Sequence, residues 1–224
     1  MPLFHFTIKY GFVLFLLLLF CQNPVQATDD EFQQWSTISL LHKINDQYFI
    51  NLLGQGRFAI SDDRPNTYVM RPSIHYNFTG SITGGLGYDY LLNDPGNNEQ
   101  RLWQEVMFKN LLGKSTLSHR FRLEERFIEE IPVIYRTRYN LKANYPLSGG
   151  KWALVGSNEI FFNLNSRGTG PAPGLDQNRL FAGLGYRTGA NSKVEFGYLW
   201  RYLNRRDTES INDHIIVFNL YIEH

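Results

Sequence analysis

Residues 192–204 read SKVEFGYLWRYLN, and this stretch decides the fold class. Its side chains alternate between an apolar set and a polar or small set. The apolar set is Val194, Phe196, Tyr198, Trp200 and Tyr202, and between them lie Glu195, Gly197, Leu199 and Arg201. Successive side chains of a β-strand point to opposite faces, so this period of two predicts a strand with one aromatic face and one polar face.

The same alternation recurs along the chain, for example at residues 68–78, 82–90 and 216–222. Each segment is about ten residues long, the length that a tilted membrane-spanning strand needs. Eleven such segments can be counted, the first near Trp35 and the last near Glu223. Bacterial single-chain barrels have even strand numbers, so a count of eleven needs an explanation. Either one strand has been overlooked, or two segments are wrongly divided, or the segment at 35–44 does not span the membrane.

The connections between these segments alternate in length. Short turns are expected at 45–46, 79–80, 113–114, 148–150 and 188–192, and longer loops at 61–66, 93–98, 129–132, 165–175 and 205–210. Short turns on one rim and longer loops on the other are typical of outer-membrane barrels. The sequence therefore predicts an all-β fold: a single antiparallel up-and-down transmembrane β-barrel of 10–12 strands over residues 35–224, preceded by an N-terminal extension at 28–34.

A soluble periplasmic lipid-binding β-barrel would show the same periodicity with its faces reversed. Two features favour the membrane. The apolar faces carry aromatic residues near strand ends, as interfacial girdles do, among them Tyr145, Trp152 and Trp200. The opposite faces carry Arg and Glu at the centres of adjacent strands, which indicates a lumen.

The first 27 residues have the features of a secretory signal peptide. Lys9 precedes the apolar run 12–21, Pro24 follows it, and Val25-Gln26-Ala27 resembles a cleavage site. The run is too short for a membrane anchor, which needs about 20 apolar residues. Phe20 is too large to precede a lipidated cysteine at Cys21. We therefore expect residues 1–27 to be removed and the protein to reside in the outer membrane of a Gram-negative cell.

Composition excludes several classes of partner and site. Removal of Lys9 leaves equal numbers of basic and acidic residues, which argues against nucleic-acid binding. Removal of Cys21, the single cysteine, excludes disulfides and thiolate metal sites. The histidines show no metal-ligand spacing and no phosphate-binding glycine loop occurs, so the sequence predicts no metal and no cofactor. The expected partner is outer-membrane lipid, and the oligomeric state stays open.

Charged residues of the central segments fall on one face and are candidate lumen-lining residues. They are Glu105, Lys109, Arg120, Arg122, Glu124, Arg126, Arg136, Arg138, Lys142 and Glu159. One interpretation is a structural salt-bridge network that fills a narrow lumen, as in small barrels. The other is a pore lining whose basic excess favours anionic solutes. Strand number does not decide between them, because barrels of this size lie between filled barrels and wide porins.

A catalytic alternative rests on Ser210, Asn212 and His214, whose spacing places them on one face of an extended chain. A Ser–His pair oriented by Asn on the lipid side would suit an outer-membrane lipid acyl hydrolase. The geometry is weak, because same-face neighbours on a strand lie ~6.5–7 Å apart, beyond hydrogen-bond reach.

Several stretches of the chain resemble one bacterial family. They are residues 119–127 (HRFRLEERF), 136–139 (RTRY), 158–163 (NEIFFN), 176–186 (DQNRLFAGLGY) and 195–199 (EFGYL), with His214 after them. The ordered series is similar to the uncharacterised family catalogued as domain of unknown function 2490, from about Trp35 to the C-terminus. The resemblance implies an exported, β-rich, outer-membrane-like protein without an assigned activity. The functional expectation is a small porin-like barrel that conducts small solutes or acts as a scaffold.

Overall fold

The computed structural model describes residues 29–60, 65–166, 170–206 and 209–224, and the predicted signal peptide lies outside these ranges. Eleven strands form here: β1 (Asp29–Lys43), β2 (Tyr48–Ala59), β3 (Asn66–Asn77), β4 (Ile82–Asp94), β5 (Glu99–Leu112), β6 (Ser115–Ile128), β7 (Ile131–Pro146), β8 (Trp152–Asn163), β9 (Gly174–Arg187), β10 (Ser192–Leu203) and β11 (Ile211–Glu223). No helix among the described residues is long and apolar enough to cross a membrane.

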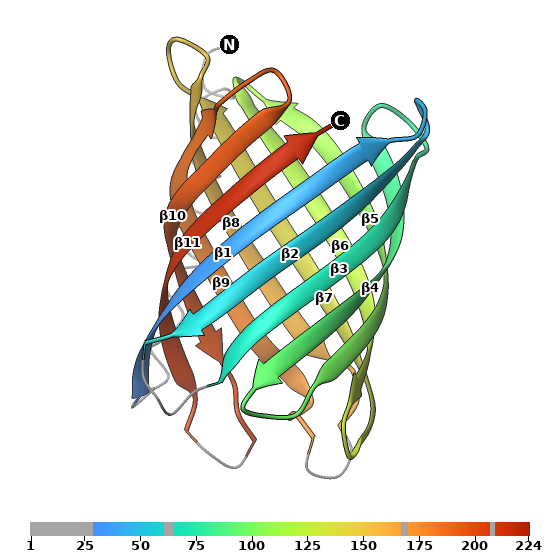
Figure 1. Cartoon of the computed structure of the whole chain (residues 1–224), viewed down its shortest axis with the longest axis vertical. Coiled ribbons are helices and arrows are strands. Elements are labelled where there is room, and N and C mark those ends of the chain that lie inside the picture. The colour runs from blue at the N-terminus through green and yellow to red at the C-terminus, as the bar shows by residue number, and fades with distance from the viewer. Residues whose placement is uncertain (1–28, 61–64, 167–169, 207–208) are drawn as a thin grey trace, which may run out of the picture.

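The strands close into a single barrel (Figure 1). Each strand from β2 to β11 pairs antiparallel with the strand before it in the chain. β1 and β11 lie side by side and close the barrel as a parallel pair, with Asp29 opposite Ile211 and Leu41 opposite Glu223. The predicted all-β barrel of 10–12 strands is confirmed.

A barrel with an odd number of strands can close because β1 and β11 pair in parallel. The expectation of an entirely antiparallel barrel is therefore wrong at this one pair. With eleven strands the first and last run in the same direction, so they can pair only in parallel. Residues 35–43 of the segment at 35–44 belong to β1, a full strand of the barrel. A second correction concerns residues 28–34, because Asp29 to Gln34 belong to β1 rather than to an extension.

The connections retain most of the predicted asymmetry. One rim has connections at 44–47, 78–81, 113–114, 147–151 and 188–191, and the other at 60–65, 95–98, 129–130, 164–173 and 204–210. The predicted longer loop at 129–132 is wrong: Glu129 and Glu130 alone join β6 to β7, and Pro132 lies within β7. Glu130 has a φ of 62°, and this left-handed conformation allows the tight turn.

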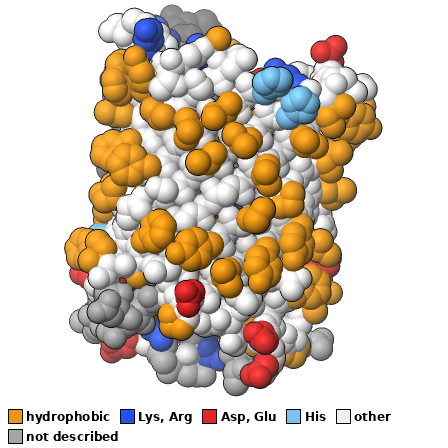
Figure 2. Space-filling model, viewed as in Figure 1, with side chains coloured by type: hydrophobic (Ala, Val, Ile, Leu, Met, Phe, Trp, Pro, Cys, Tyr) orange, Lys and Arg blue, Asp and Glu red, His pale blue; other side chains and the backbone are white. Residues whose placement is uncertain are grey.

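The barrel is apolar outside and charged inside. Phe196 and Tyr198 on β10 are exposed, whereas Glu195 and Arg201 on the same strand are buried. Figure 2 shows apolar side chains spread over the visible face, with acidic and basic groups gathered toward its two ends. This distribution is the reverse of a soluble barrel and matches the apolar band of membrane barrels.

Candidate functional site

The structure brings most of the ten candidate lumen residues together on the inner wall. Arg120 and Lys142 are half-buried beside a central cavity, and Lys109 is exposed near the end of β5, away from the ion pairs. The remaining seven are buried: Glu105, Arg122, Glu124, Arg126, Arg136, Arg138 and Glu159. Lys109 was expected to line the lumen with the others. It lies on the inward face of β5, as predicted, but near the end of the strand, at the rim of the barrel.

Glu124 is the centre of the ion-pair network. Its side chain has no exposed surface and accepts hydrogen bonds from Arg136 Nη2 at 2.6 Å and from Arg138 Nη1 at 2.5 Å. The register of β6 and β7 sets Arg136 directly opposite Glu124. Arg122 Nη1 lies 3.8 Å from the same carboxylate. One buried anion thus holds three cations from two adjacent strands.

The network continues from Glu124 around the barrel. Arg138 also contacts Glu159 at 2.7 Å, and Glu159 accepts a 2.5 Å hydrogen bond from Arg120. Arg136 Nη1 donates to Asp176 Oδ2 at 2.8 Å, which links β7 to β9. Charge-assisted bonds of this length are the strong class, and here they link strands that are not neighbours.

Sequence reasoning missed several members of the lumen. Glu99 on β5 accepts bonds from Arg101 at 2.7 Å and Arg126 at 2.5 Å. Lys142 reaches across the lumen to Glu195 on β10 at 2.7 Å. Arg57, Asp176, Arg179 and Asp213 were also missed. Arg71, Asp89 and Arg201 were placed on the polar face of their segments but not among the ten candidates. The sequence does contain a signal for these residues, because the faces of a strand alternate. Asp89, Arg71, Glu195 and Arg201 lie at the positions between the apolar residues of their segments, which face inward.

Asp89 organises a second cluster on β3, β4 and β5. It accepts a bidentate pair from Arg71 at 2.7 and 2.6 Å and a 2.6 Å hydrogen bond from the Trp103 indole N–H. Trp103 lies over Gly87, its neighbour in the β4–β5 register. A Cβ at Gly87 would overlap the Trp103 ring, so glycine at this position makes room for the indole.

We expect Gly87→Ala to destabilise the barrel by about 1–3 kcal/mol, because the methyl group displaces the Trp103 ring from Asp89. The measurement is urea unfolding of the protein folded into lipid vesicles. Gly54→Ala is the matched control, since nothing lies within 4 Å of a Cβ there, and it should be close to neutral. Equal effects of the two variants would contradict this reading of the Gly87 contact.

The lumen is filled most tightly in the half nearer the longer connections. Buried inward side chains in that half of their strands include Gln33, Val69, Leu91, Glu99, Arg101, Arg126, Ile134, Arg136, Asn163, Asp176, Arg201, Ile211 and Asp213. Toward the short turns, inward side chains are more accessible, among them Asn51, Ser73, Thr83, Met107 and Asn144. The lumen is therefore packed toward one rim and looser toward the other.

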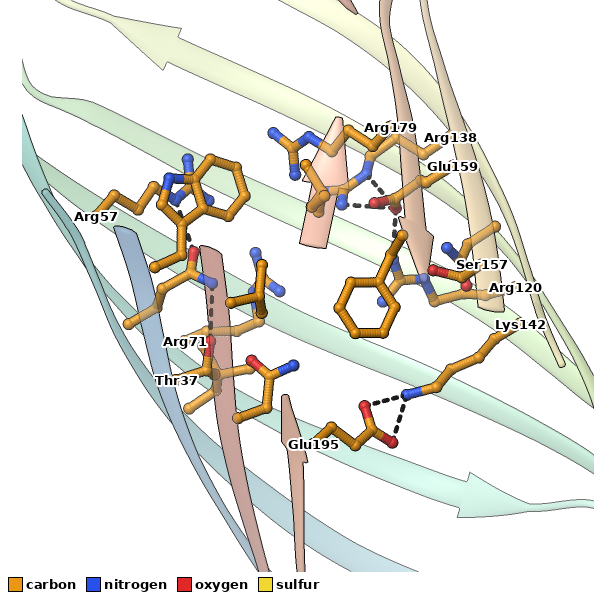
Figure 3. A pocket seen from close by; sticks show the side chains of 18 of the residues that line it. Thr37, Arg57, Arg71, Arg120, Arg138, Lys142, Ser157, Glu159, Arg179 and Glu195 are labelled. Atoms are coloured by element: carbon orange, nitrogen blue, oxygen red, sulfur yellow. Dashed lines mark hydrogen bonds and ion pairs between the residues drawn. The ribbon is translucent and has the colours of Figure 1, made fainter. Parts of the chain in front are cut away.

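A cavity of about 230 Å³ lies between these regions (Figure 3). Its lining includes Arg57, Arg71, Arg101, Arg120, Arg138, Arg179 and Lys142, but only two carboxylates, Glu159 and Glu195. Neutral polar groups complete the wall, among them Thr37, Gln55, Asn140, Ser157 and Asn219. The cavity therefore presents hydrogen-bond donors and positive charge to whatever occupies it.

The proposed hydrolase residues do not form a catalytic unit. Ser210 is buried and its hydroxyl bonds the Tyr202 hydroxyl at 2.9 Å. His214 Nδ1 bonds the Tyr198 hydroxyl at 2.6 Å, and its Nε2 faces Asp30 at 3.7 Å. Neither nitrogen of His214 bonds the serine, so His214 is not placed to act as its base, and within the described ranges the Ser210 hydroxyl bonds Tyr202 instead. Asn212 lies between them on β11 and pairs in register with Tyr202 and Asp30.

Metal ligation has no geometric support in the ranges that the structure describes. No three His, Cys, Asp or Glu side chains there are placed to hold a metal ion. The lumenal carboxylates are occupied instead by guanidinium and ammonium groups.

Solved structures with a similar fold are outer-membrane barrels. The NanC porin superposes with a TM-score of 0.51 at 8% identity, over 78% of this chain and 86% of that chain. The outer membrane protein OmpT of Vibrio cholerae gives a TM-score of 0.44 at 12% identity, over 77% of this chain and 60% of that chain. At its low identity, the likeness to the NanC porin concerns the fold alone.

A sequence relative of this chain is itself uncharacterized. An uncharacterized protein of Methylorubrum extorquens is 29% identical over 213 residues, covering 90% of each chain. Residues 32–212 match the family described as "Protein of unknown function (DUF2490)", and this range contains the five stretches that carry the resemblance. With most of its barrel inside that match, from β1 to the start of β11, the chain belongs to this family of unknown function.

Proposed function

We propose that this protein is an integral outer-membrane β-barrel with a closed lumen, acting as a rigid scaffold for the loops at its rims. The outer wall supports the location, because apolar side chains such as Leu86, Val106 and Phe121 are about half-exposed along the strands. Leaving such side chains in water would be unfavourable, whereas lipid solvates them. The fold likeness to the NanC porin supports the same location.

One observation supports the proposal of a closed lumen. Glu124, Arg136 and Arg138 form ion pairs between β6 and β7 inside the barrel, and their side chains have almost no exposed surface. A conducting path would leave such groups hydrated, as they are in the water-filled channels of porins. These side chains instead satisfy one another, and Arg136 extends the bridge to Asp176 on β9. This is how small barrels fill their interiors.

The experiment has two stages on the full chain. Expressing cells are fractionated, and the detergent-extracted protein is run on gels with and without boiling. We expect recovery with the outer membrane and faster migration before boiling than after it. The purified barrel is then added to planar bilayers, where we expect no steady ion current. Recovery in a soluble periplasmic fraction would contradict the location, and a stable open-channel current would contradict the closed lumen.

A narrow solute channel is the second candidate, and the central cavity favours it. The cavity has seven cationic side chains in its wall, and two of them, Arg57 and Arg179, form no ion pair with any described residue. A passage through it should favour anions, because the fixed positive charge attracts them. The same bilayer experiment separates the candidates: a channel gives a current whose reversal potential in a potassium chloride gradient shifts toward the chloride equilibrium potential.

A further inference from the structure

Two lumenal arginines, Arg57 on β2 and Arg179 on β9, differ from the rest. Among the described residues, neither has a carboxylate oxygen within 4.0 Å of its guanidinium. The other inward arginines each have such a partner: Arg71, Arg101, Arg120, Arg122, Arg126, Arg136, Arg138 and Arg201. Arg57 and Arg179 are therefore the two inward arginines of the described ranges that form no ion pair. Glu159 lies opposite Arg179 in the β8–β9 register, but its carboxylate is held by Arg120 and Arg138.

Neutral amides hold these two side chains in place. Arg57 Nε donates to Gln55 Oε1 at 2.6 Å, and the Gln55 amide in turn donates to Thr37 Oγ1 at 2.9 Å. Arg179 donates through Nη2 to Gln177 Oε1 at 2.8 Å. In both cases the amide stands two residues before the arginine on the same strand. Such a contact orients a guanidinium without neutralising it, and leaves other N–H groups able to donate.

The same spacing occurs elsewhere in this barrel with an acid in place of the amide. Glu99 stands two residues before Arg101 on β5 and accepts bonds from its Nε at 2.7 Å and its Nη2 at 2.9 Å. Glutamate and glutamine have the same shape and differ in charge. The Glu99–Arg101 pair therefore shows what a neutralised version of the Gln55–Arg57 contact would look like.

Both of these arginines lie against the ring of Trp35, which the ion-paired Arg201 also approaches at 5.3 Å. The guanidinium carbon of Arg57 is 4.4 Å from the ring centroid of Trp35, and that of Arg179 is 5.1 Å from it. Cation–π contact stabilises each charge without cancelling it. Two like charges are thus held together inside a barrel, where repulsion is stronger than in bulk water. An anion bound between them would relieve this repulsion.

We propose that Arg57 and Arg179, over Trp35, bind the oxyanion of a small organic acid inside the central cavity. All three residues line the cavity, and Arg57 and Arg179 are labelled in Figure 3. A carboxylate or a phosphate has the geometry that a guanidinium pairs with in a bidentate manner. The hydroxyls and amides of Thr37, Ser157 and Asn140 suit a hydroxylated body on the same solute.

The size of the cavity limits this solute. The volume of the cavity is about 230 Å³. Sites for drug-sized ligands are larger, at roughly 300–1,000 Å³. The ligand class is therefore a small polar anion comparable to a sugar acid or a short hydroxy acid. This inference deepens the proposed function but needs only the folded barrel, not conduction through it.

The test is isothermal titration calorimetry of the detergent-purified full chain, with gluconate, inorganic phosphate and neutral glucose as probes. We expect saturable binding of gluconate and none of glucose. Phosphate binding as tight as gluconate binding would assign the site to the oxyanion alone, and weaker phosphate binding would assign it to a hydroxylated carboxylate. Arg57→Gln and Arg179→Gln should each weaken gluconate binding about tenfold or more, the loss typical of charge-assisted bonds.

Gln55→Glu is the decisive variant, because it keeps Arg57 and should pair it internally as Glu99 pairs Arg101. We expect it to weaken gluconate binding at least as much as Arg57→Gln. Asn51→Asp is the matched control: it adds the same charge on the same strand, outside the cavity wall, and should change affinity less than twofold. Heat-modifiable gel migration verifies that each variant is folded.

Three results would overturn the proposal. They are absence of saturable gluconate binding to the folded wild type, equal binding of glucose, and an Asn51→Asp effect as large as that of Gln55→Glu. A non-conducting barrel that fails this binding test would contradict the site alone, and a conducting barrel that passes it would contradict the closed lumen alone. A non-conducting barrel that passes it would leave the closed-lumen function intact.

Discussion

Replacement of Glu124 by Gln is expected to lower the free energy of unfolding by about 3–5 kcal/mol, the usual cost of removing one partner from a buried ion pair. Glu124 has no exposed surface and lies within 4 Å of three guanidinium groups. Glutamine preserves the shape but not the charge. In the variant, Arg136 keeps its ion pair with Asp176 and Arg138 keeps its ion pair with Glu159. The carboxylate that both arginines share is lost.

The measurement is equilibrium unfolding in urea of the barrel reconstituted in lipid vesicles, followed by tryptophan fluorescence. Lys43→Gln is the control, because its ion pair with Glu223 at the rim is exposed and should contribute less than about 1 kcal/mol. If Glu124→Gln were no more destabilising than Lys43→Gln, the lumenal network would not contribute to stability as described.

Replacement of Val106 by Arg is expected to destabilise the barrel by about 2–4 kcal/mol in vesicles, the cost of a cation at the membrane midplane on the lipid face. Val106 is about half-exposed, and it lies near the middle of β5 with its side chain directed outward. An arginine here must leave water for hydrocarbon or draw lipid headgroups inward. Both responses cost free energy.

Leu112→Arg on the same strand is the matched control. Leu112 shares the outward face of Val106 but ends β5 at the short-turn rim, where the cost should fall to about 0–1 kcal/mol. Unfolding in vesicles of both variants supplies the comparison. On the surface of a soluble barrel both changes would lie within about 0.5 kcal/mol of neutral, so equal small effects would contradict the membrane assignment.

Much of the barrel could be predicted because its signal is local. Alternation of period two along residues 192–204 depends only on how a strand directs neighbouring side chains, and Phe196 and Glu195 lie on the predicted faces. The range of 10–12 strands followed from the same counting. The turn at Glu129 and Glu130 was misjudged, because a tight turn there needs a non-glycine residue at positive φ, which composition does not reveal.

The sequence predicts which side chains face the lumen, but not which residues they pair with there. Strand parity places Arg136 and Glu124 inside, and the β6–β7 hairpin makes them neighbours. Lys142 was also expected inside, yet its partner Glu195 lies on β10, three strands away. The sequence also did not reveal how far along the barrel axis a residue lies. Lys109 shares the inward face of Glu105 but lies at the rim. Contacts across the lumen depend on the curvature and stagger of the whole barrel.

The sequence by itself determined that the chain forms outward apolar and inward charged strands, joined by turns of alternating length. Both properties are local, because side-chain direction and turn geometry involve only neighbouring residues. Tertiary structure alone decided that β1 meets β11 in parallel and that Arg57 and Arg179 converge on Trp35 without forming an ion pair within the described part of the chain. These features depend on which strands meet when the sheet closes, and closure brings together residues from opposite ends of the chain.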